Sequence, residues 1–389
     1  MKRKLIMDAG AAALASGGVS DLDLTRIAAS AGLKPSSLRY YFRNREELAE
    51  ALYCERLEEL EAIVDEASGE ATLLDCIRHI FAVEVRSTVE RLKGGQTRRP
   101  QLGEIRSLEI ERRRRLGQIY LRLLAKSDRM FERFGYRKGP LNIPVQTQIL
   151  LENIFWIPAW IEHFAEWEMP TVIEQCARIV THGFTEINLN IDFDTPVETV
   201  GKQPGEVDPF LKIASQLICE RGYRGTSIDA IADRLGVTKG SFYHHNSEKE
   251  GLVERCFTLS YQRVSEFQRV ATEASTDPLR RLVSVLRSIV QAQLDQDFPL
   301  MRTAALPGLP QELRRKLISA ADPLDRWFVG EIARIGQNGI VLNGDPYIAA
   351  QCLLIGANAT YDLARFQGYG ALPTTVADHV ELLLNGIAM

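Results

Sequence analysis

Two segments of the sequence, Leu33–Arg45 and Val237–Lys249, carry side chains that could bind phosphate groups. The second has a formal charge of only +1, because Glu248 offsets one of Lys239 and Lys249. The first has no acidic residue and a charge of +4, from Lys34, Arg39, Arg43 and Arg45. Basic groups attract phosphate oxygens and neighbouring hydroxyl groups bond to them, so this composition favours binding of a polyanion, most of all by the first segment.

Other chemistries lack the residues that they need. The sequence contains no G-x-S-x-G, G-x-x-x-x-G-K-[ST], G-x-G-x-x-G or H-E-x-x-H motif. His244 and His245 are neighbours, which on a helix point about 100° apart, so the pair does not indicate a metal site. The six cysteines are too far apart for a disulfide scaffold or a zinc finger. We therefore expect no enzymatic activity, no bound metal and no cofactor.

Composition and charge set broad limits on the kind of protein. With 389 residues, 45% hydrophobic and 25% charged, the chain is long enough for two or more globular domains. Its net charge of −4 argues against bulk coating of nucleic acid, although a locally basic face would be averaged away. No apolar run approaches the ~20 residues of a transmembrane helix, and Asp8 interrupts the signal-peptide-like start. We expect a cytoplasmic protein without a membrane segment.

The sequence is an internal repeat of about two hundred residues. A shift of 204 aligns Gly18 with Gly222, Gly32 with Gly236 and other positions without a gap. Between the halves, residues 191–207 belong to a stretch rich in Pro, Gly and acids, which predicts a solvated linker. Duplication of one ancestral unit is the simplest account.

Apolar residues recur at helical spacing throughout both units, and long alternating strand patterns are absent. We therefore predict an all-α fold. The body helices are expected over Leu73–Val89, Ile105–Phe134, Val145–Phe164, Thr171–Phe184, Leu279–Leu294, Leu313–Ile335, Tyr347–Phe366 and Thr374–Leu384. Four consecutive arginines, Arg112–Arg115, are typical of a solvated helix face.

Near the start of each unit the pattern predicts two short helices joined by a glycine turn. In the first unit Asp23 is expected to cap Leu24–Ala31, Gly32 to form the turn and Ser36–Tyr41 to form the second helix. In the second unit Thr226 or Ser227 caps Ile228–Leu235, Gly236 turns, and Gly240–His245 follows. This helix-turn-helix arrangement places a recognition helix in a DNA major groove.

The segments GLKPSSLRYYFRNREEL (Gly32 to Leu48) and GVTKGSFYHHNSEKEGL (Gly236 to Leu252) resemble the DNA-binding signature of TetR-family transcriptional regulators. Asn246 departs from it, since the family has a buried Phe there, as at Phe42. The resemblance implies two tandem units, each a three-helix DNA-binding head on a helical ligand-binding body whose last two helices form a four-helix dimer interface. The implied division is 1–50 and 208–254 for the heads, 51–190 and 255–389 for the bodies, and 191–207 for the linker.

The resemblance also implies which side chains face double-stranded operator DNA. Among them Arg39 is the best candidate for a bidentate guanine contact, and Arg45 and Lys249 are expected to reach phosphate. The full set is Lys34, Ser36, Ser37, Arg39, Tyr40, Tyr41 and Arg45 in the first head, and Thr238, Lys239, Ser241, Tyr243, His244, His245 and Lys249 in the second.

An aromatic cluster in the first body has two interpretations. Trp156, Trp160, Phe164 and Trp167 lie at i, i+4, i+8 and i+11, on one face if Val145–Phe164 and its continuation form one helix. Such a stripe is more often core or interface than a ligand pocket. The aligned stretch of the second unit carries Asn358 and Tyr361, a more polar lining. If both bodies bind an effector, we expect two different molecules.

The resemblance therefore implies a transcriptional repressor that an unknown small molecule releases from DNA. Because dimerising helices occur twice in one chain, the two units are expected to form an intramolecular pseudo-dimer, with a homodimer of chains as a further possibility. The alternative is a helical scaffold or protein-binding module in which one or both heads no longer bind DNA. Salt-dependent binding to operator DNA distinguishes the two.

Overall fold

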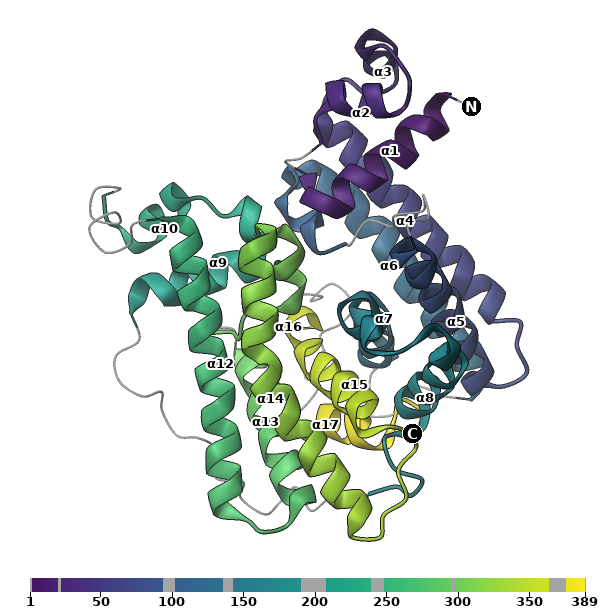
Figure 1. Cartoon of the computed structure of the whole chain (residues 1–389), viewed down its shortest axis with the longest axis vertical. Coiled ribbons are helices and arrows are strands. Elements are labelled where there is room, and N and C mark those ends of the chain that lie inside the picture. Colours follow the sequence, from purple (N-terminus) through teal and green to yellow (C-terminus); the bar gives the residue numbers. More distant parts are fainter. Residues whose placement is uncertain are drawn as a thin grey trace.

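The computed structural model describes residues 2–19, 22–93, 102–135, 143–189, 208–238, 248–295, 298–363 and 376–388 (Figure 1). Within these ranges every named element is a helix, and one isolated β-bridge joins Thr185 to Leu342. The all-α prediction is confirmed. No helix in the described part of the chain has the length and apolar character needed to cross a membrane.

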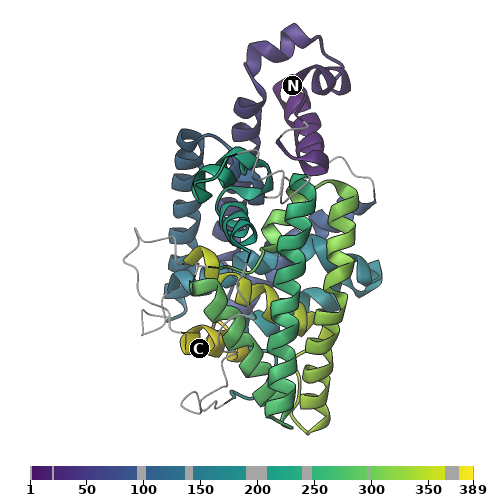
Figure 2. The same cartoon turned by 90° about the vertical axis from the view of Figure 1, so that its left-hand side faces the viewer.

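The first unit begins with three helices that project from the rest of the molecule, as Figure 2 shows. They lead into α4, which runs down into the body. The helices are α1 (Lys2–Gly17), α2 (Leu24–Ser30), α3 (Pro35–Tyr41), α4 (Arg45–Ala67), α5 (Leu73–Leu92), α6 (Ile110–Arg133), α7 (Ile143–Trp160) and α8 (Met169–His182). Three short 3₁₀ turns accompany them, η2 (Leu102–Ser107), η3 (Ile161–His163) and η4 (Glu166–Glu168).

The described elements of the second unit follow a similar order. Its elements are α9 (Pro209–Gly225), α10 (Ile228–Leu235), α12 (Lys249–Ala274), α13 (Pro278–Asp295), η5 (Thr303–Gly308), α14 (Gln311–Gln337), α15 (Pro346–Asn358), α16 (Thr360–Leu363) and α17 (Val376–Asn385). Thus η2 and α6 in the first unit correspond to η5 and α14 in the second.

Three predicted body helices are shorter than expected. The tract Ile105–Phe134 divides into η2 and α6, with Leu108 and Glu109 between them. The tract Val145–Phe164 ends as a helix at Trp160, because Pro158 lacks an N–H group and strains the last turn, and 3₁₀ turns follow. The tract Tyr347–Phe366 is broken after Asn358, and its last residues lie outside the described ranges.

The two bodies share one hydrophobic core. In Figure 1 α15 lies beside α7 and α8 of the first unit, and these helices are in contact. Buried residues from both units, such as Ile154 and Leu353, belong to the same cluster. A buried ion pair, Arg302 Nη2 to Glu152 Oε1 at 3.2 Å, also joins the units.

The ends of α8 and α17 cross at two glycines. Gly183 and Gly386 both have positive φ, 85° and 86°, and a Cβ atom on Gly183 would collide with the carbonyl oxygen of Leu384. The close approach lets the amide nitrogen of Ile387 donate to the carbonyl oxygen of Val180 at 2.9 Å. Small residues are needed here because two backbones meet.

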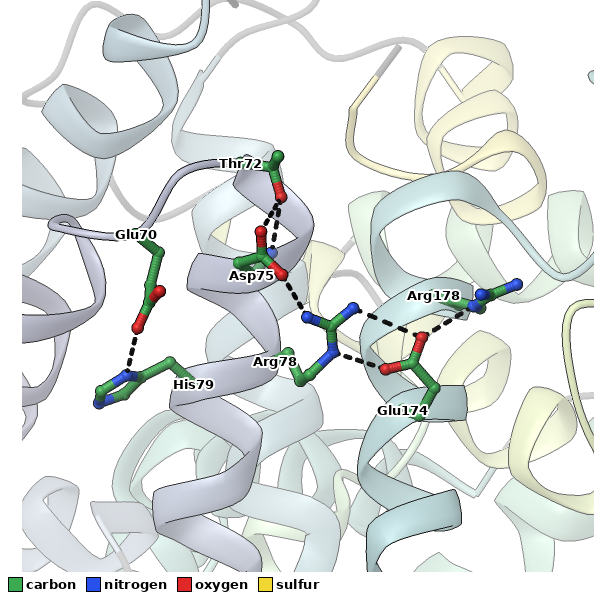
Figure 3. Close-up of polar contacts among 7 residues, drawn as sticks. All are labelled: Glu70, Thr72, Asp75, Arg78, His79, Glu174 and Arg178. Carbon is green, nitrogen blue, oxygen red and sulfur yellow. Dashed lines mark hydrogen bonds and ion pairs between the residues drawn. The ribbon is translucent and has the colours of Figure 1, made fainter.

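Within the first body, α8 is fixed to α5 by the polar cluster in Figure 3. Arg78 pairs with Asp75 on its own helix and, from Nε, with Glu174 Oε2 on α8 at 2.5 Å. Arg178 Nε also donates to Glu174, at 2.9 Å. These two arginines lower the pKa of Glu174. The cluster therefore orients α8, whose other side meets the second unit.

Candidate nucleic-acid interface and effector cavity

The first helix-turn-helix is built from local signals. Asp23 Oδ1 accepts hydrogen bonds from the amide nitrogens of Thr25 at 2.7 Å and Arg26 at 3.3 Å, which caps α2 as predicted. Gly32 has φ +66°, and Pro35 occupies the first turn of α3. Leu38 is fully buried beneath α3, so the opposite face of this helix is turned outward.

The outward face of α3 carries the side chains expected to contact DNA. Ser36 and Arg39 are exposed, Tyr40 is 86% exposed, and Ser37 and Tyr41 are half-buried. The rings of Tyr40 and Tyr41 meet edge-on, with centroids 5.3 Å apart. Two phenol groups beside a guanidinium and a hydroxyl can donate to phosphate oxygens and to base edges.

The basic groups of this head are available to a ligand. Lys34, Arg39, Arg43 and Arg45 are all exposed, and none of them forms an ion pair with another described residue. Elsewhere in the unit arginines are paired with carboxylates, as Arg114 is with Glu111. The surface around α3 is therefore a cluster of unneutralised positive charge, which suits a phosphate backbone.

The second head is only partly described. Ser227 Oγ accepts from the amide nitrogen of Ala230 at 3.0 Å and caps α10, and Gly236 is left-handed with φ +69°. Thr238 ends this segment. The other predicted contact residues lie outside the described ranges; they are Lys239, Ser241, Tyr243, His244 and His245, together with Asn246.

Lys249 differs from Arg45, its counterpart in the repeat. Its Nζ lies 4.1 Å from the ring centroid of Tyr223, and burial lowers the pKa of Lys249 to about 8. Arg45 is exposed instead. The Lys249 ammonium thus points at an aromatic ring of its own head rather than outward.

The second head is held against both 3₁₀ turns. Arg106 Nη1 of η2 donates to the carbonyl oxygen of Cys219 on α9 at 2.8 Å. Arg224 Nε, near the end of α9, donates to the carbonyl oxygen of Gly308 in η5 at 3.0 Å. The first head touches η5 through α1. The two heads are consequently attached to the bodies in different ways.

Each head is connected to its body by a long helix, α4 or α12, and one of the helices on which it packs is α6 or α14, respectively. In the first unit Glu50 of α4 pairs with Arg112 and, at 2.5 Å, with Arg115 of α6, and both arginines lower the pKa of Glu50. Arg112 also lies 3.5 Å from Glu46. We call this the first joint. The expectation of a solvated arginine face is therefore wrong for Arg112, whose side chain is 17% exposed.

In the second unit the corresponding helices α12 and α14 form the second joint. Lys316 Nζ pairs with Glu254 Oε1 at 2.6 Å. Lys316 corresponds to Arg115 of the first unit, because each residue lies five positions after the first residue of its helix. Leu313 stands where the first unit has Arg112 and is buried in an apolar cluster with Leu217 of α9. The second joint is thus mainly hydrophobic.

A cavity of about 320 Å³ lies inside the second body, close to this joint. Helices α12, α14 and α15 and the turn η5 form most of its wall, and α7 and η3 of the first unit complete it. Residues from the first unit are Trp156, Trp160 and His163; among those from the second are Tyr261, Asp325, Tyr347, Gln351 and Asn358. Small-molecule sites are commonly of this size and mostly apolar.

The predicted ligand residues divide between the cavity and other places. Trp156, Trp160 and Asn358 line it, whereas Phe164, Trp167 and Tyr361 are absent from its wall. Trp167 is 82% exposed, since α7 ends at Trp160 and the single aromatic face predicted for one long helix does not form. Tyr361 is buried, with the Arg302 guanidinium 5.2 Å from its ring centroid.

Apart from Asn358, the sequence interpretation missed the polar groups of the wall. Asp325 and Tyr347 both line the cavity; burial raises the pKa of Asp325 to about 6 and that of Tyr347 to about 12. The signal that could have found Asp325 is its spacing from Asp322. Two carboxylates at i and i+3 lie on the same side of a helix, here α14.

The family comparisons agree with this architecture. The model of the bacterial regulatory proteins of the tetR family matches residues 6–52 and 210–256, once at the start of each unit. Two matches to the same DNA-binding domain, together with the similarity to TetR-family relatives, support a tandem TetR-family regulator.

Curated relatives match parts of the chain. The HTH-type transcriptional repressor KstR2 of Mycobacterium tuberculosis is 30% identical over 93 residues, 24% of this chain and 45% of the relative. The HTH-type transcriptional regulator AcrR of Shigella flexneri is 26% identical over 129 residues, 33% of this chain and 53% of the relative. The chain spans about half the length of these relatives. A solved structure, the TetR family transcriptional regulator PfmR from Thermus thermophilus, is 23% identical with a TM-score of 0.40, covering 46% of this chain and 99% of that one.

Proposed function

We propose that this protein is a sequence-specific DNA-binding transcriptional regulator, a repressor that a small molecule releases from its operator. The observation that carries the proposal is the outward face of α3, where exposed Arg39 and Tyr40 stand among basic groups without ion-pair partners. The heads are residues 1–50 and 208–254, the bodies 51–190 and 255–389, and 191–207 the linker.

The side chains of the first head have distinct roles in this proposal. Lys34, Arg45 and the hydroxyl groups of Ser36, Ser37, Tyr40 and Tyr41 bind the phosphate backbone and fix the register. Arg39 reaches a base edge. The second head contributes Thr238, Lys239, Ser241, Tyr243, His244, His245 and Lys249, and Lys249 must leave the Tyr223 ring to reach phosphate.

The experiment is binding of the full chain to its own promoter DNA over a range of salt concentrations. Arg45→Ala should weaken binding to every sequence and reduce the slope of log affinity against log salt by about 1. Arg39→Ala should cost about 1–3 kcal/mol, mainly at one base pair. Arg114→Ala removes an exposed arginine outside the head and should change neither value.

The same experiment also distinguishes this proposal from the alternative, a helical scaffold or protein-binding module. A chain that shows no salt-dependent binding to promoter DNA would be a scaffold or protein-binding module with inactive heads. Identical base-pair profiles for Arg39→Ala and Arg45→Ala would contradict the roles given to these two residues.

We further propose that one chain acts as its own dimer. Contacts of α15 with α7 and α8, the shared core and the Glu152–Arg302 pair support this pairing. Because the two heads carry different residues, the preferred operator should be asymmetric, since a palindrome mirrors two identical readers. Light scattering measures the assembly, and selection from random DNA measures the operator. A mass of two chains with a palindromic site would contradict the pseudo-dimer.

Release from DNA is proposed to be a population shift. The cavity and the second joint share α12 and α14, so a ligand that moves α14 also moves the helix that carries the second head. A ligand that favours the displaced arrangement lowers DNA affinity by a coupling free energy of typically ~1–3 kcal/mol, and DNA lowers the affinity of the ligand equally.

A further inference from the structure

The polar groups of the cavity wall show which charge a ligand should carry. Asp322 and Asp325 lie three residues apart on α14, and both line the cavity. Asp325 accepts one hydrogen bond, from Gln351 Nε2 at 3.3 Å. Neither carboxylate forms an ion pair with any residue of the described ranges. Asp325 is thus a half-buried carboxylate and Asp322 a solvent-exposed one, and neither has an ion-pair partner among the described residues.

Several other polar side chains of the wall already have partners. Ser260 Oγ donates to the carbonyl oxygen of Cys256 at 3.1 Å and accepts from the amide nitrogen of Met301 at 2.9 Å. Tyr261 donates from its hydroxyl to the carbonyl oxygen of Leu317 at 3.0 Å. Asn358 Oδ1 accepts from Gln293 at 2.8 Å. Compared with these three side chains, the two carboxylates keep unused acceptor capacity, which a donor ligand satisfies.

Aromatic rings stand beside these carboxylates. Tyr347 has its ring centroid 6.4 Å from that of Trp160 and 5.3 Å from that of His163, and all three residues line the cavity. Faces of tryptophan and tyrosine attract cations. Among the described residues that line the cavity, Arg326 is the only arginine, and its side chain is exposed to solvent.

We propose that this cavity binds an apolar amine, a molecule with a hydrocarbon body and one protonated amino group. The ammonium group pairs with Asp325 beside the Trp160 and Tyr347 rings, and the hydrocarbon lies against side chains such as Val264 and Leu354. This inference names the class of effector and so rests on the proposed function.

The same site is connected to the other unit through one amide. Gln351 donates to Asp325 and accepts from Trp156 Nε1 of α7 at 3.1 Å. An ammonium group on Asp325 competes with the long bond from Gln351. A change in the Gln351 hydrogen bonds alters the surroundings of the Trp156 indole, so the fluorescence emission of Trp156 should change when an amine binds.

The test compares three probes of equal chain length, octylamine, octanol and octanoate, on the full chain without DNA. Tryptophan emission and thermal stability report binding. Octylamine should bind about tenfold tighter than the other two, because only its ammonium group can donate charge-assisted hydrogen bonds to the Asp325 carboxylate. Asp325→Asn should lower octylamine affinity about tenfold and leave octanol affinity unchanged. The control Asp8→Asn, at an exposed position of α1, should change neither affinity.

Several results would overturn the assignment. Equal affinity for octylamine and octanol, tighter binding of octanoate, or an Asp325→Asn protein that still prefers octylamine would each do so. The comparison of probes on the unaltered chain needs no variant to fold. Promoter binding is measured separately. A chain that binds the amine but does not bind DNA would contradict the proposed function alone. Release from DNA by octanoate and not by octylamine would contradict this inference alone.

Discussion

The first and second joints connect equivalent heads to equivalent bodies by different interactions. The first joint is a network of charges, in which Glu50 bridges Arg112 and Arg115. The second keeps one exposed ion pair, Glu254 with Lys316, and fills the position of Arg112 with the buried side chain of Leu313.

The same packing of two helices therefore tolerates two kinds of stabilisation. A buried leucine contributes through burial of apolar area and close packing. A charged network contributes through hydrogen bonds whose strength depends on protonation and, where it is exposed, on salt. The second head, also fixed to η2 and η5, is expected to be the more firmly attached of the two.

The largest expected loss of stability comes from truncating the buried side chain of Leu313 in the second joint. Leu313→Ala leaves a cavity in the cluster that holds α9, α12 and α14, and a substitution of this kind costs about 2–5 kcal/mol. Urea unfolding followed by circular dichroism measures the loss. Ile110→Ala, which truncates a 63% exposed side chain at the start of α6, is the control and should change stability little. A loss for Leu313→Ala as small as the control would show that apolar packing does not hold the second joint.

Removing the central carboxylate of the first joint should have an intermediate effect. Glu50→Gln leaves Arg112 and Arg115 facing a neutral amide, and hydrogen bonds to charged groups are worth about 1.5–3 kcal/mol. The same unfolding experiment measures it, with Glu55→Gln, on the exposed side of α4, as the matched control. Equal stability of the two variants would mean that the network contributes nothing.

The first joint should also respond to acid. Arg115 and Arg112 hold the pKa of Glu50 below its ordinary value of 4.5, so its contribution is complete above that pH and is lost as pH falls through the lower value of the folded protein. The stability difference between the unaltered chain and Glu50→Gln should therefore shrink below about pH 4. A difference that stays constant to about pH 3 would exclude this titration.

The smallest expected effect is that of the ion pair in the second joint. Glu254 and Lys316 are 36% and 64% exposed, and exposed pairs contribute about 0–1 kcal/mol. Glu254→Gln should cost no more than this, and added salt should reduce the cost further. A loss as large as that of Glu50→Gln would erase the contrast between the two joints.

The sequence predicts the heads better than the cavity, for a physical reason. Asp23, Gly32 and Pro35 act within a few residues of themselves, so caps and turns are visible in the local pattern. The cavity depends on contacts between distant residues, such as Trp156 with Gln351, 195 positions apart. No local pattern shows that α7 of one unit completes a cavity of the other.

Helix ends in the bodies were harder to predict than helix positions. The apolar spacing continues past Trp160 to Phe164, although the helix does not. Pro158 marks the break, but a proline near the end of a helix can also be accommodated as a kink. For the same reason Trp167 was predicted to lie on the aromatic face of one long helix, and that face does not form because α7 ends at Trp160.

The core shared by α7, α8 and α15 has a consequence for gene dosage. Partners on separate chains come apart on dilution by mass action, whereas halves of one chain stay at a fixed effective concentration. Pairing of the halves should therefore be as complete at nanomolar as at micromolar protein. Each molecule contains one copy of each head, so the ratio of the two heads does not depend on the expression level.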